Sequence, residues 1–461
     1  MTSEKVKNMK YIFHPKGIAV VGASTKPDKL GNIVLKHLVG EGFEGKVYPV
    51  NPKYDRILGM KCYSDVTKIK GKVDCVVIAT PAPTVPKIIQ QCGKKKVRGV
   101  IVLSGGFGEV GNIELESKLK ETAERYDIAC IGPNCLGVFD PYTDVDSLFF
   151  PRYKLQRPGP GDISFVTQSG AVGECIMDLA AHYGIGVSKF ISYGNGTVLD
   201  ESDVLEYLER DKKTKQVILY IEGVKDGKKL FERIKKVNKK KPVVVLKAGK
   251  YGKALEAAMS HTGNIAGNYL AYKAAFRQTK VTEAEDIEEL FDFVKIFGQP
   301  LPKGKRIGVI TNGGGLGVLT TDAIEEQGLL TSVFGKDTEK KLREVVPAHR
   351  NIGNPLDVAA DANVELYKNS LDVFMGDRGV DGIIVAVLFQ SPAINEDIVD
   401  VLVKASDDRR KPIVVVAVGG SYTDNYRRIL EGKGVPTYGS PLGAVKAMKR
   451  FVDYSLSKKN K

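Results

Sequence analysis

The stretch Lys16-Gly17-Ile18-Ala19-Val20-Val21-Gly22-Ala23-Ser24 decides the fold that the sequence predicts for the beginning of the chain. Its apolar run is typical of a buried parallel strand. The Gly/Ser turn that ends it leads into a helical pattern over residues 30–39. This order of strand, turn and helix is the first unit of a Rossmann-like nucleotide-binding sheet. The GxGxxG dinucleotide fingerprint is absent, because Gly22 is followed by Ala23 and Ser24.

The end of the next strand favours a phosphorylated ligand. The strand Lys46-Val47-Tyr48-Pro49-Val50 leads to Lys53, at a place where an NAD site needs a carboxylate for the ribose hydroxyls. A lysine there suits a phosphate instead. A phosphorylated adenosine such as coenzyme A (CoA) therefore fits this strand end better than NAD.

Two later strand ends carry further candidate contacts. Residues 74–79 form an apolar strand that ends in Thr80-Pro81-Ala82, a rigid lip at the carboxyl edge of the sheet, where ligands bind. Residues 128–131 form another strand, which leads to Asn134. Strands that alternate with helices predict an open parallel sheet, which we expect to close by about Asp140.

A second α/β region follows a linker over residues 150–161 that is rich in Pro and Gly. Its first strand ends in Gln168-Ser169-Gly170, which opens a helix that runs through Ala181. Free backbone N–H groups at a helix start, together with a hydroxyl, form an anion site. An ordinary helix with a serine cap is the alternative interpretation of the same residues.

His261 lies in a stretch that also contains Gly249, Gly252, Gly263 and Gly267, in a chain with 5 histidines. Glycines on both sides of the histidine are what a moving loop requires. Imidazole is a good nucleophile near neutral pH and can hold a phosphoryl group. Glu222 follows the strand over residues 216–221 and is predicted at the same sheet edge, where it can accept one imidazole N–H. The alternatives are an inert surface loop and an exposed glutamate.

A third region repeats the glycine-rich helix start. A strand over residues 306–310 is followed by Asn312-Gly313-Gly314-Gly315, which turns into a helix that runs through Glu326. The recurrence of the Gln168 turn predicts that two helix N-termini converge on one anion. Neither turn matches the P-loop pattern GxxxxGK(S/T). Strands over residues 382–388 and 412–418 complete a flavodoxin-like sheet.

The predicted class is α/β, with a Rossmann-like domain over residues 1–145 and flavodoxin-like domains over residues 160–298 and 303–461. The length of 461 residues agrees with three domains, at about 150 residues per domain. The Pro- and Gly-rich linkers supply the boundaries.

The composition excludes several classes of protein. The 6 cysteines form no CxxC pair, which argues against a metal site of the zinc type and for a reducing cytoplasm. The net charge of +14 comes from lysines interleaved with glutamates, a pattern that favours a solvated surface over nucleic-acid binding. No apolar run approaches the length of a membrane span, and the first residues lack a signal-peptide core.

The set of motifs resembles the nucleoside-diphosphate-forming acyl-CoA synthetases, relatives of succinyl-CoA synthetase, over essentially the whole chain. The greatest similarity is to the α subunits of the archaeal ADP-forming acetyl-CoA synthetases. The motifs that together carry the resemblance are Gly22-Ala23-Ser24, Gly132-Pro133-Asn134-Cys135, Gln168-Ser169-Gly170, Tyr220-Ile221-Glu222-Gly223, Ser260-His261-Thr262-Gly263 and Asn312-Gly313-Gly314-Gly315.

The resemblance implies a role for each candidate residue. It implies that His261 is transiently phosphorylated, that Glu222 stabilises it, and that the helices starting near Ser169-Gly170 and Gly314-Gly315 face the phosphate. For CoA, it implies contacts at Gly22, Ala23 and Ser24, a phosphate near Lys53, the pantetheine arm along Thr80-Pro81-Ala82, and the thiol end near Asn134.

The implied reaction is acyl-CoA + ADP + phosphate to acid + ATP + CoA, through an acyl phosphate and a phosphohistidine. The chain contains no ATP-grasp segment, which fused members of the family carry. The resemblance therefore implies a separate ATP-grasp β subunit in an α2β2 heterotetramer, with Mg²⁺ accompanying ADP or ATP at that subunit. The acyl group stays open among acetyl, branched-chain and aryl acids, and the nucleotide between ADP and GDP.

Two other functions are compatible with parts of the sequence. A non-enzymatic CoA-binding regulatory module would use the same fold, although the His261 and Glu222 pair argues against it. An NAD(P)-linked oxidoreductase is compatible with the Rossmann-like start, but the broken glycine fingerprint and Lys53 oppose it.

Overall fold

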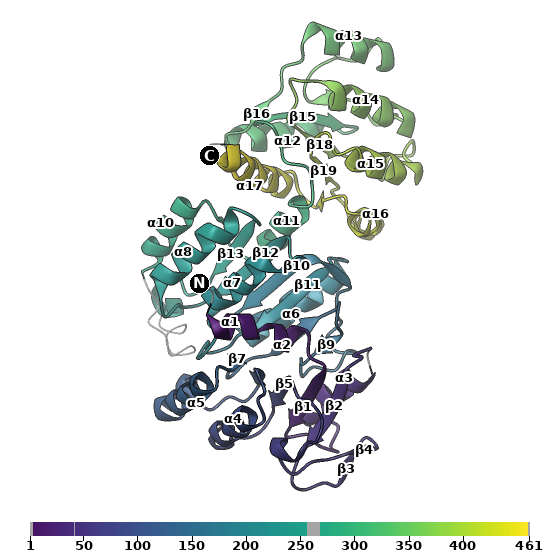
Figure 1. Cartoon of the computed structure of the whole chain (residues 1–461). Coiled ribbons are helices and arrows are strands. Elements are labelled where there is room, and N and C mark those ends of the chain that lie inside the picture. The colour runs from purple at the N-terminus through teal and green to yellow at the C-terminus, as the bar shows by residue number, and fades with distance from the viewer. Residues whose placement is uncertain (1–2, 41, 256–267, 460–461) are drawn as a thin grey trace. The chain divides into compact units, whose positions relative to one another are not determined.

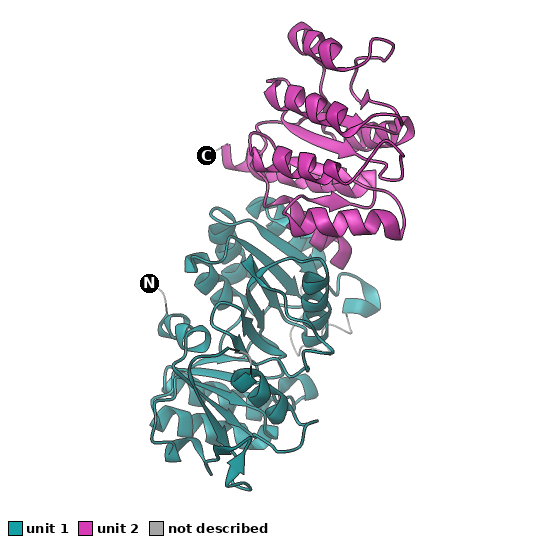
Figure 2. Cartoon of the chain, turned by 90° about the vertical axis from the view of Figure 1, so that its right-hand side faces the viewer, with its two compact units in different colours: residues 1–283 teal, residues 284–461 magenta. Residues whose placement is uncertain are grey.

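The computed structural model describes residues 3–40, 42–255 and 268–459. The chain divides into two compact units, residues 1–283 and 284–461 (Figures 1 and 2). Among the residues described, none of the helices combines the length and the hydropathy that crossing a membrane demands.

The first unit contains a parallel sheet with the strand order β2-β1-β5-β6-β7 (Figure 1). Its strands are β1 (Gly17–Val21), β2 (Lys46–Val50), β5 (Cys75–Ile78), β6 (Gly99–Val102) and β7 (Ala129–Ile131), with a hairpin of β3 (Arg56–Ile57) and β4 (Met60–Lys61) beside them. The helices of this region are α1 (Glu4–Asn8), α2 (Lys10–Phe13), α3 (Leu30–Gly40), α4 (Val85–Lys94) and α5 (Ile113–Arg125). Strand β1 pairs on both sides and all of its residues are buried, which is why it is a continuous apolar run.

The turn after β1 requires glycine at two positions. Gly22 has a φ of +90°, in the region that L side chains rarely adopt, and a Cβ there would collide with the carbonyl oxygen of Ala79. A Cβ at Gly31, in the first turn of α3, would collide with the carbonyl oxygen of Gly22. The helix start therefore packs directly on the turn, although the GxGxxG pattern is absent.

The second sheet has the order β14-β13-β12-β10-β11-β8-β9. Its strands are β8 (Gly137–Asp140), β9 (Val145–Asp146), β10 (Pro160–Thr167), β11 (Val187–Ser192), β12 (Gln216–Ile221), β13 (Val243–Lys247) and β14 (Thr282–Ala284). Its helices are α6 (Gly170–His182), α7 (Glu201–Arg210), α8 (Gly227–Asn238) and α10 (Tyr269–Thr279).

The chain passes from the first sheet to the second between β7 and β8. The first sheet ends with β7 at Ile131, in agreement with the predicted last strand over residues 128–131, whereas strand β8 was not predicted. Strand β8 pairs antiparallel with β11 of the second sheet, with Ile191 opposite Val138. A short apolar run does not reveal which sheet it joins, because only the tertiary fold decides its partner.

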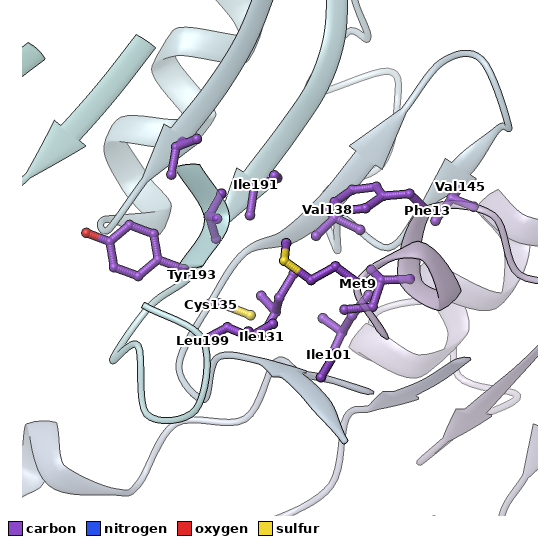
Figure 3. Close-up of a cluster of buried hydrophobic side chains, with 14 of the residues drawn as sticks. Met9, Phe13, Ile101, Ile131, Cys135, Val138, Val145, Ile191, Tyr193 and Leu199 are labelled. Carbon is purple, nitrogen blue, oxygen red and sulfur yellow. The ribbon is translucent and has the colours of Figure 1, made fainter. Parts of the chain in front are cut away.

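One continuous hydrophobic core joins the two sheets. Figure 3 shows Met9 and Ile131 from the first sheet and its N-terminal helices beside Val138 and Ile191 from the second. These side chains have exposures of at most 1%. Burial of this kind is worth about 1.5–3 kcal/mol per large apolar side chain, so the two sheets form one unit.

The second unit contains a parallel sheet with the order β16-β15-β18-β19-β20, and β17 pairs with β15. Its strands are β15 (Arg306–Thr311), β16 (Leu330–Thr331), β17 (Leu356–Asp357), β18 (Gly382–Ala386), β19 (Ile413–Val416) and β20 (Thr437–Tyr438). Its helices are α11 (Ile287–Ile296), α12 (Gly314–Glu326), α13 (Lys336–Val345), α14 (Val364–Gly376), α15 (Asp397–Asp407), α16 (Ser421–Gly432) and α17 (Pro441–Lys459). Helix α11 packs on α17, where Phe297 contacts Phe451 edge to face at 5.5 Å.

Candidate functional site

The turns after β1 and β2 are joined by hydrogen bonds. The side-chain amide of Asn51 donates to the carbonyl oxygen of Ala23 at 2.7 Å, and its oxygen accepts from the backbone N–H of Lys53 at 3.0 Å. Lys53 itself is exposed. The structure thus brings Lys53 next to the Gly22-Ala23-Ser24 turn, with a cationic side chain in solvent at the carboxyl edge of the sheet.

The remaining strand ends continue the same edge toward Asn134. The carbonyl oxygen of Thr80 accepts from the hydroxyl of Ser104 at 2.5 Å, and the carbonyl oxygen of Ser104 accepts from the backbone N–H of Asn134 at 2.9 Å. In the lip after β5, Thr80 is half-buried, Pro81 is exposed and Ala82 is buried.

These residues therefore follow the strand order of the sheet. Lys53 comes after β2, Ser24 after β1, Thr80 after β5 and Asn134 after β7. With neighbouring strands about 4.8 Å apart, the row from β2 to β7 spans roughly 19 Å. An elongated ligand fits such a row better than a compact one.

A cavity of about 290 Å³ lies at the Asn134 end of this row. It is formed by both sheets of the first unit. Its polar lining consists of Asn134, Gln168, Ser169, Glu174, Asn195 and Glu222. Its apolar lining consists of Leu103, Cys135, Leu136, Phe149, Phe150 and Ala171. Five residues selected from the sequence, Asn134, Gln168, Ser169, Gly170 and Glu222, thus line one cavity.

Glu222 is fixed through hydrogen bonds to its backbone, and only 8% of its surface is exposed. The side-chain oxygen of Gln168 accepts from the backbone N–H groups of Glu222 at 2.8 Å and of Gly223 at 3.1 Å. The Glu222 carboxylate accepts from the hydroxyl of Tyr220 at 3.2 Å. Burial, and then the Glu222 carboxylate, raise the pKa of the Tyr220 hydroxyl, so Tyr220 remains a neutral donor toward Glu222.

Lys247 joins the ends of β12 and β13. Its ammonium donates to the carbonyl oxygen of Glu222 at 2.7 Å and to that of Ala248. It lies 4.8 Å from the ring centroid of Tyr272. Burial lowers the pKa of Lys247 to about 8. Lys247 and Gln168 thus bind the same peptide group between Glu222 and Gly223, the lysine at its carbonyl oxygen and the glutamine at its N–H.

Helix α6 begins at the cavity. The hydroxyl of Ser169 accepts from the backbone N–H of Val172 at 3.3 Å, so Ser169 is the N-cap of the helix. The cap satisfies one of the free N–H groups of the first turn. Because Ser169, Gly170 and Ala171 also line the cavity, the positive end of the α6 dipole faces it.

Asn195 was not predicted from the sequence as a site residue, although it lies next to Asn134. Its oxygen accepts from the amide of Asn134 at 3.4 Å, while its own amide donates to Glu109 at 2.6 Å and to Glu116 at 3.1 Å. Although burial opposes it, the hydrogen bonds from Asn195 and from the backbone of Gly106 hold the pKa of Glu109 below its ordinary value. The two carboxylates orient the Asn195 amide, which in turn orients Asn134.

The glycine-rich start of α12 belongs to the second unit. The side chain of Asn312 is occupied by the backbone of Leu388, with its oxygen accepting from the N–H at 2.8 Å and its amide donating to the carbonyl at 3.2 Å. Gly313 is the N-cap and makes no side-chain cap. Gly314 and Gly315 are exposed, and a Cβ on Gly314 would lie 2.7 Å from the carboxylate of Asp357. The convergence of α12 and α6 on one anion stays a prediction.

His261 lies outside the described residues, so its predicted pairing with Glu222 stays a prediction. The described residues nearest to it in the sequence are those after β13, up to residue 255, and those from residue 268, just before α10. At these ends Tyr251 and Tyr269 contact edge to face at 5.4 Å, and Tyr269 donates to Glu283 at 2.7 Å.

Comparison with known proteins agrees with this architecture. Family models match residues 16–141 as a CoA binding domain, residues 160–297 as a succinyl-CoA ligase like flavodoxin domain, and residues 307–445 as a ligase-CoA domain. A CoA binding domain followed by these two ligase domains places the chain in the class of succinyl-CoA ligase-like proteins.

Individual relatives and solved structures indicate the family within this class. The α subunit of acetate–CoA ligase (ADP-forming) II from Pyrococcus furiosus is 39% identical, over 94% of both chains. Acetate–CoA ligase (ADP-forming) I from Archaeoglobus fulgidus is 41% identical over 97% of this chain, which spans 64% of that relative's length. A dinucleotide-forming acetyl-coenzyme A synthetase 1 from Ca. Korarchaeum cryptofilum, solved with phosphate and ADP, superposes with a TM-score of 0.92 at 33% identity and covers 98% of this chain and 97% of that one. The chain belongs to the family of ADP-forming acetate–CoA ligases.

Proposed function

We propose that this chain is the acyl-transferring α subunit of an ADP-forming acyl-CoA synthetase that works in the cytoplasm. The reaction is acyl-CoA + ADP + phosphate to acid + ATP + CoA. The single observation that carries the proposal is the cavity of about 290 Å³ in which Asn134, at the end of the row of strand-end turns, meets Gln168, Ser169 and Glu222.

The proposed path of CoA follows the row of turns. Lys53 contacts a phosphate, the Gly22-Ala23-Ser24 turn holds the nucleotide portion, and the pantetheine arm passes Thr80-Pro81-Ala82 to place the thiol near Asn134. The row fits an elongated molecule, and the turn after β1 is tight enough for close approach of backbone to ligand. The exposed Lys53 ammonium supplies the charge that a phosphate needs.

The proposed chemistry takes place in the cavity. Phosphate bound at the start of α6 attacks the thioester carbonyl, which releases CoA and leaves an acyl phosphate. His261 then takes the phosphoryl group and frees the acid, with Glu222 accepting the other imidazole N–H. The helix dipole stabilises the anionic groups. At another stage of the reaction, the phosphoryl group is proposed to contact the glycine-rich start of α12, which consists of Asn312, Gly313, Gly314 and Gly315.

The proposed partner is a separate ATP-grasp β subunit that binds ADP or ATP with Mg²⁺, in an α2β2 heterotetramer. Two Pyrococcus furiosus relatives are named α subunits and match over nearly their full lengths, which supports a two-subunit enzyme. The functional segments of this chain are proposed as residues 1–145, 160–298 and 303–461.

The test is phosphoryl labelling of the reconstituted complex. The chain and the ATP-grasp subunit are incubated with γ-labelled ATP, and acid-labile phosphate is measured on this chain. We expect labelling of the wild type and none of His261→Ala, while both bind CoA in calorimetry. Retained label in His261→Ala removes this residue from the mechanism. CoA binding without label or turnover supports the non-enzymatic regulatory module instead.

A further inference from the structure

Asn195 lines the cavity and is buried, with 5% of its surface exposed. We infer that Asn195 is a positioning residue for acyl transfer, because it fixes Asn134 in place beside the thioester of the bound acyl-CoA. This inference rests on the proposed function, which places the thiol end of CoA near Asn134. Since Asn195 acts through Asn134, it should affect the rate of acyl transfer more than the affinity for CoA.

The Asn195 turn (residues 194–197), which follows β11, packs directly on the turn after β7. The backbone N–H of Asn195 donates to the carbonyl oxygen of Pro133 at 3.0 Å. Gly194 has a φ of +56°, and a Cβ on it would lie 2.2 Å from the carbonyl oxygen of Asn134. The two backbones therefore lie in contact with no side chain between them, and a shift of the Asn195 turn would displace Asn134.

The hydrogen bonds of the Asn195 side chain fix the direction in which its amide faces. Its nitrogen lies 2.6 Å from Oε2 of Glu109 and 3.1 Å from Oε2 of Glu116. Carboxylates only accept hydrogen bonds, so the Asn195 amide donates both of its N–H groups to them. Its oxygen then faces the side-chain nitrogen of Asn134 at 3.4 Å. Because an amide oxygen only accepts, the NH2 group of Asn134 must point toward it, which sets the orientation of the Asn134 amide in the cavity.

The two carboxylates are themselves fixed by backbone groups of the loop after β6. Glu109 accepts from the backbone N–H of Gly106 at 2.5 Å, and Glu116 accepts from that of Gly108 at 2.9 Å. The carboxylates therefore keep other donors when the side chain of Asn195 is removed. We expect a variant at this position to fold, because the removal leaves neither carboxylate without a hydrogen bond.

The Asn195 turn also contacts the segment that follows Glu222. The ammonium of Lys225, the third residue after Glu222, donates to the carbonyl oxygen of Gly196 at 3.5 Å. The turn thus contacts both Asn134 and the segment that carries Glu222. Acyl transfer requires the reacting atoms to lie about 3–3.5 Å apart, and a displacement of about 1 Å can lower the rate by about a hundredfold. A turn that joins the two segments is therefore expected to control this step.

The experiment separates acyl transfer from phosphoryl transfer in the reconstituted complex. Asn195→Ala should lower kcat for ATP formation from acetyl-CoA, ADP and phosphate by at least about tenfold. The KM for acetyl-CoA and the Kd for CoA should stay within about threefold of the wild type. Labelling of this chain by γ-labelled ATP requires no thioester, so Asn195→Ala should retain it.

The possible outcomes distinguish the inference from the proposed function. A kcat of Asn195→Ala within about threefold of the wild type overturns the inference. A parallel loss of labelling, CoA binding and turnover also overturns it, because Asn195 would then act only in folding. A wild-type complex that neither takes up label nor turns over acetyl-CoA contradicts the proposed function, and the inference with it.

The matched control is Thr197→Val in the same turn. The hydroxyl of Thr197 donates to Glu116 at 2.7 Å, so this variant also removes a hydrogen bond to that carboxylate, but it keeps the Asn195 amide. Its kcat should stay within about threefold of the wild type. An equal loss of kcat in both variants would show that the stability of the turn sets the rate, and not the Asn195 amide, which would overturn the inference.

Discussion

The side-chain oxygen of Gln168 accepts the backbone N–H of Glu222 at 2.8 Å, and it also accepts the next N–H along the chain, that of Gly223, at 3.1 Å. The turn after β10 therefore fixes the turn after β12. The two backbone N–H groups are buried, and one amide oxygen satisfies both of them.

Replacement of Gln168 should disturb Glu222 without touching its carboxylate. Gln168→Ala leaves the two N–H groups without their acceptor, which should lower the free energy of unfolding by about 1–3 kcal/mol and turnover by at least about tenfold. Gln168→Glu keeps an acceptor oxygen and should retain more of the free energy of unfolding, whereas its added negative charge beside the proposed phosphate site should keep turnover low. Steady-state kinetics and urea unfolding measure the two effects. Equal losses of stability in the two variants would show that the acceptor oxygen does not stabilise the turn.

Alanine in place of Gly22 should damage the proposed CoA site. The backbone φ of +90° and the carbonyl of Ala79 both oppose a side chain there. We expect CoA affinity to fall by at least about tenfold, because the turn must move to relieve the collision. The control is Gly59→Ala in the β3–β4 hairpin, where φ is +76° but a Cβ meets no atom within 4 Å. It should lose about 1 kcal/mol of stability and keep CoA binding. Calorimetric titration of both variants with CoA is the measurement.

Removal of the charge of Lys53 should weaken CoA binding in a manner that depends on salt. Lys53→Gln loses one ammonium beside the Ser24 turn, so CoA affinity should fall several-fold at low ionic strength and differ less from the wild type at 0.5 M salt, where charges are screened. Lys87→Gln, an exposed lysine on α4, is the charge-matched control and should bind CoA like the wild type. A loss of CoA affinity that does not depend on salt would indicate that Lys53 maintains the structure of the turn and does not contact a phosphate.

The buried Glu201 at the start of α7 should make stability depend on pH. Burial, and then the neighbouring Asp200, raise the pKa of Glu201 from 4.5 to about 8. Between these two values the native chain holds a proton that the unfolded chain releases, so the free energy of unfolding falls as pH rises from about 5 to 8. The slope is at most about 1.4 kcal/mol per pH unit for one group.

Glu201→Gln isolates this effect. The variant cannot ionise at position 201, so its stability relative to the wild type should increase steadily from pH 5 to pH 8. Urea unfolding at four pH values in this interval measures the difference. Parallel pH profiles for the two proteins would mean that Glu201 titrates alike in the native and unfolded chains.

The sequence predicted the long buried strands and most of the glycine-rich turns at their ends. Strands β1, β5 and β13 were predictable because both of their faces are covered, which makes them continuous apolar runs. The strands β16, β17 and β20 have two residues each, and so few residues contain no periodic signal. The last strand of the first sheet was predicted, whereas β8 was not, because a short apolar run does not specify its partner strand.

The candidate site was predictable where a residue follows a strand directly. Asn134, Gln168 and Glu222 were found in this way and line one cavity. Asn195 carries the same signal, since it lies between Gly194 and Gly196 just after β11 and both glycines have positive φ values of 56° and 58°. Phe149 and Phe150 gave no such signal, because they lie at a linker whose contacts only the fold defines.

The crossing of the chain from β7 to β8 has a consequence for where the protein can be divided. Asn134 lies on the covalent bridge between the two sheets, and β8 and β9, although they follow the first sheet directly in the sequence, complete the second. A cut at residue 145 would remove the strand that pairs with the edge of β11 and leave its backbone groups open to aggregation. A fragment that starts after this cut is therefore expected to be poorly soluble.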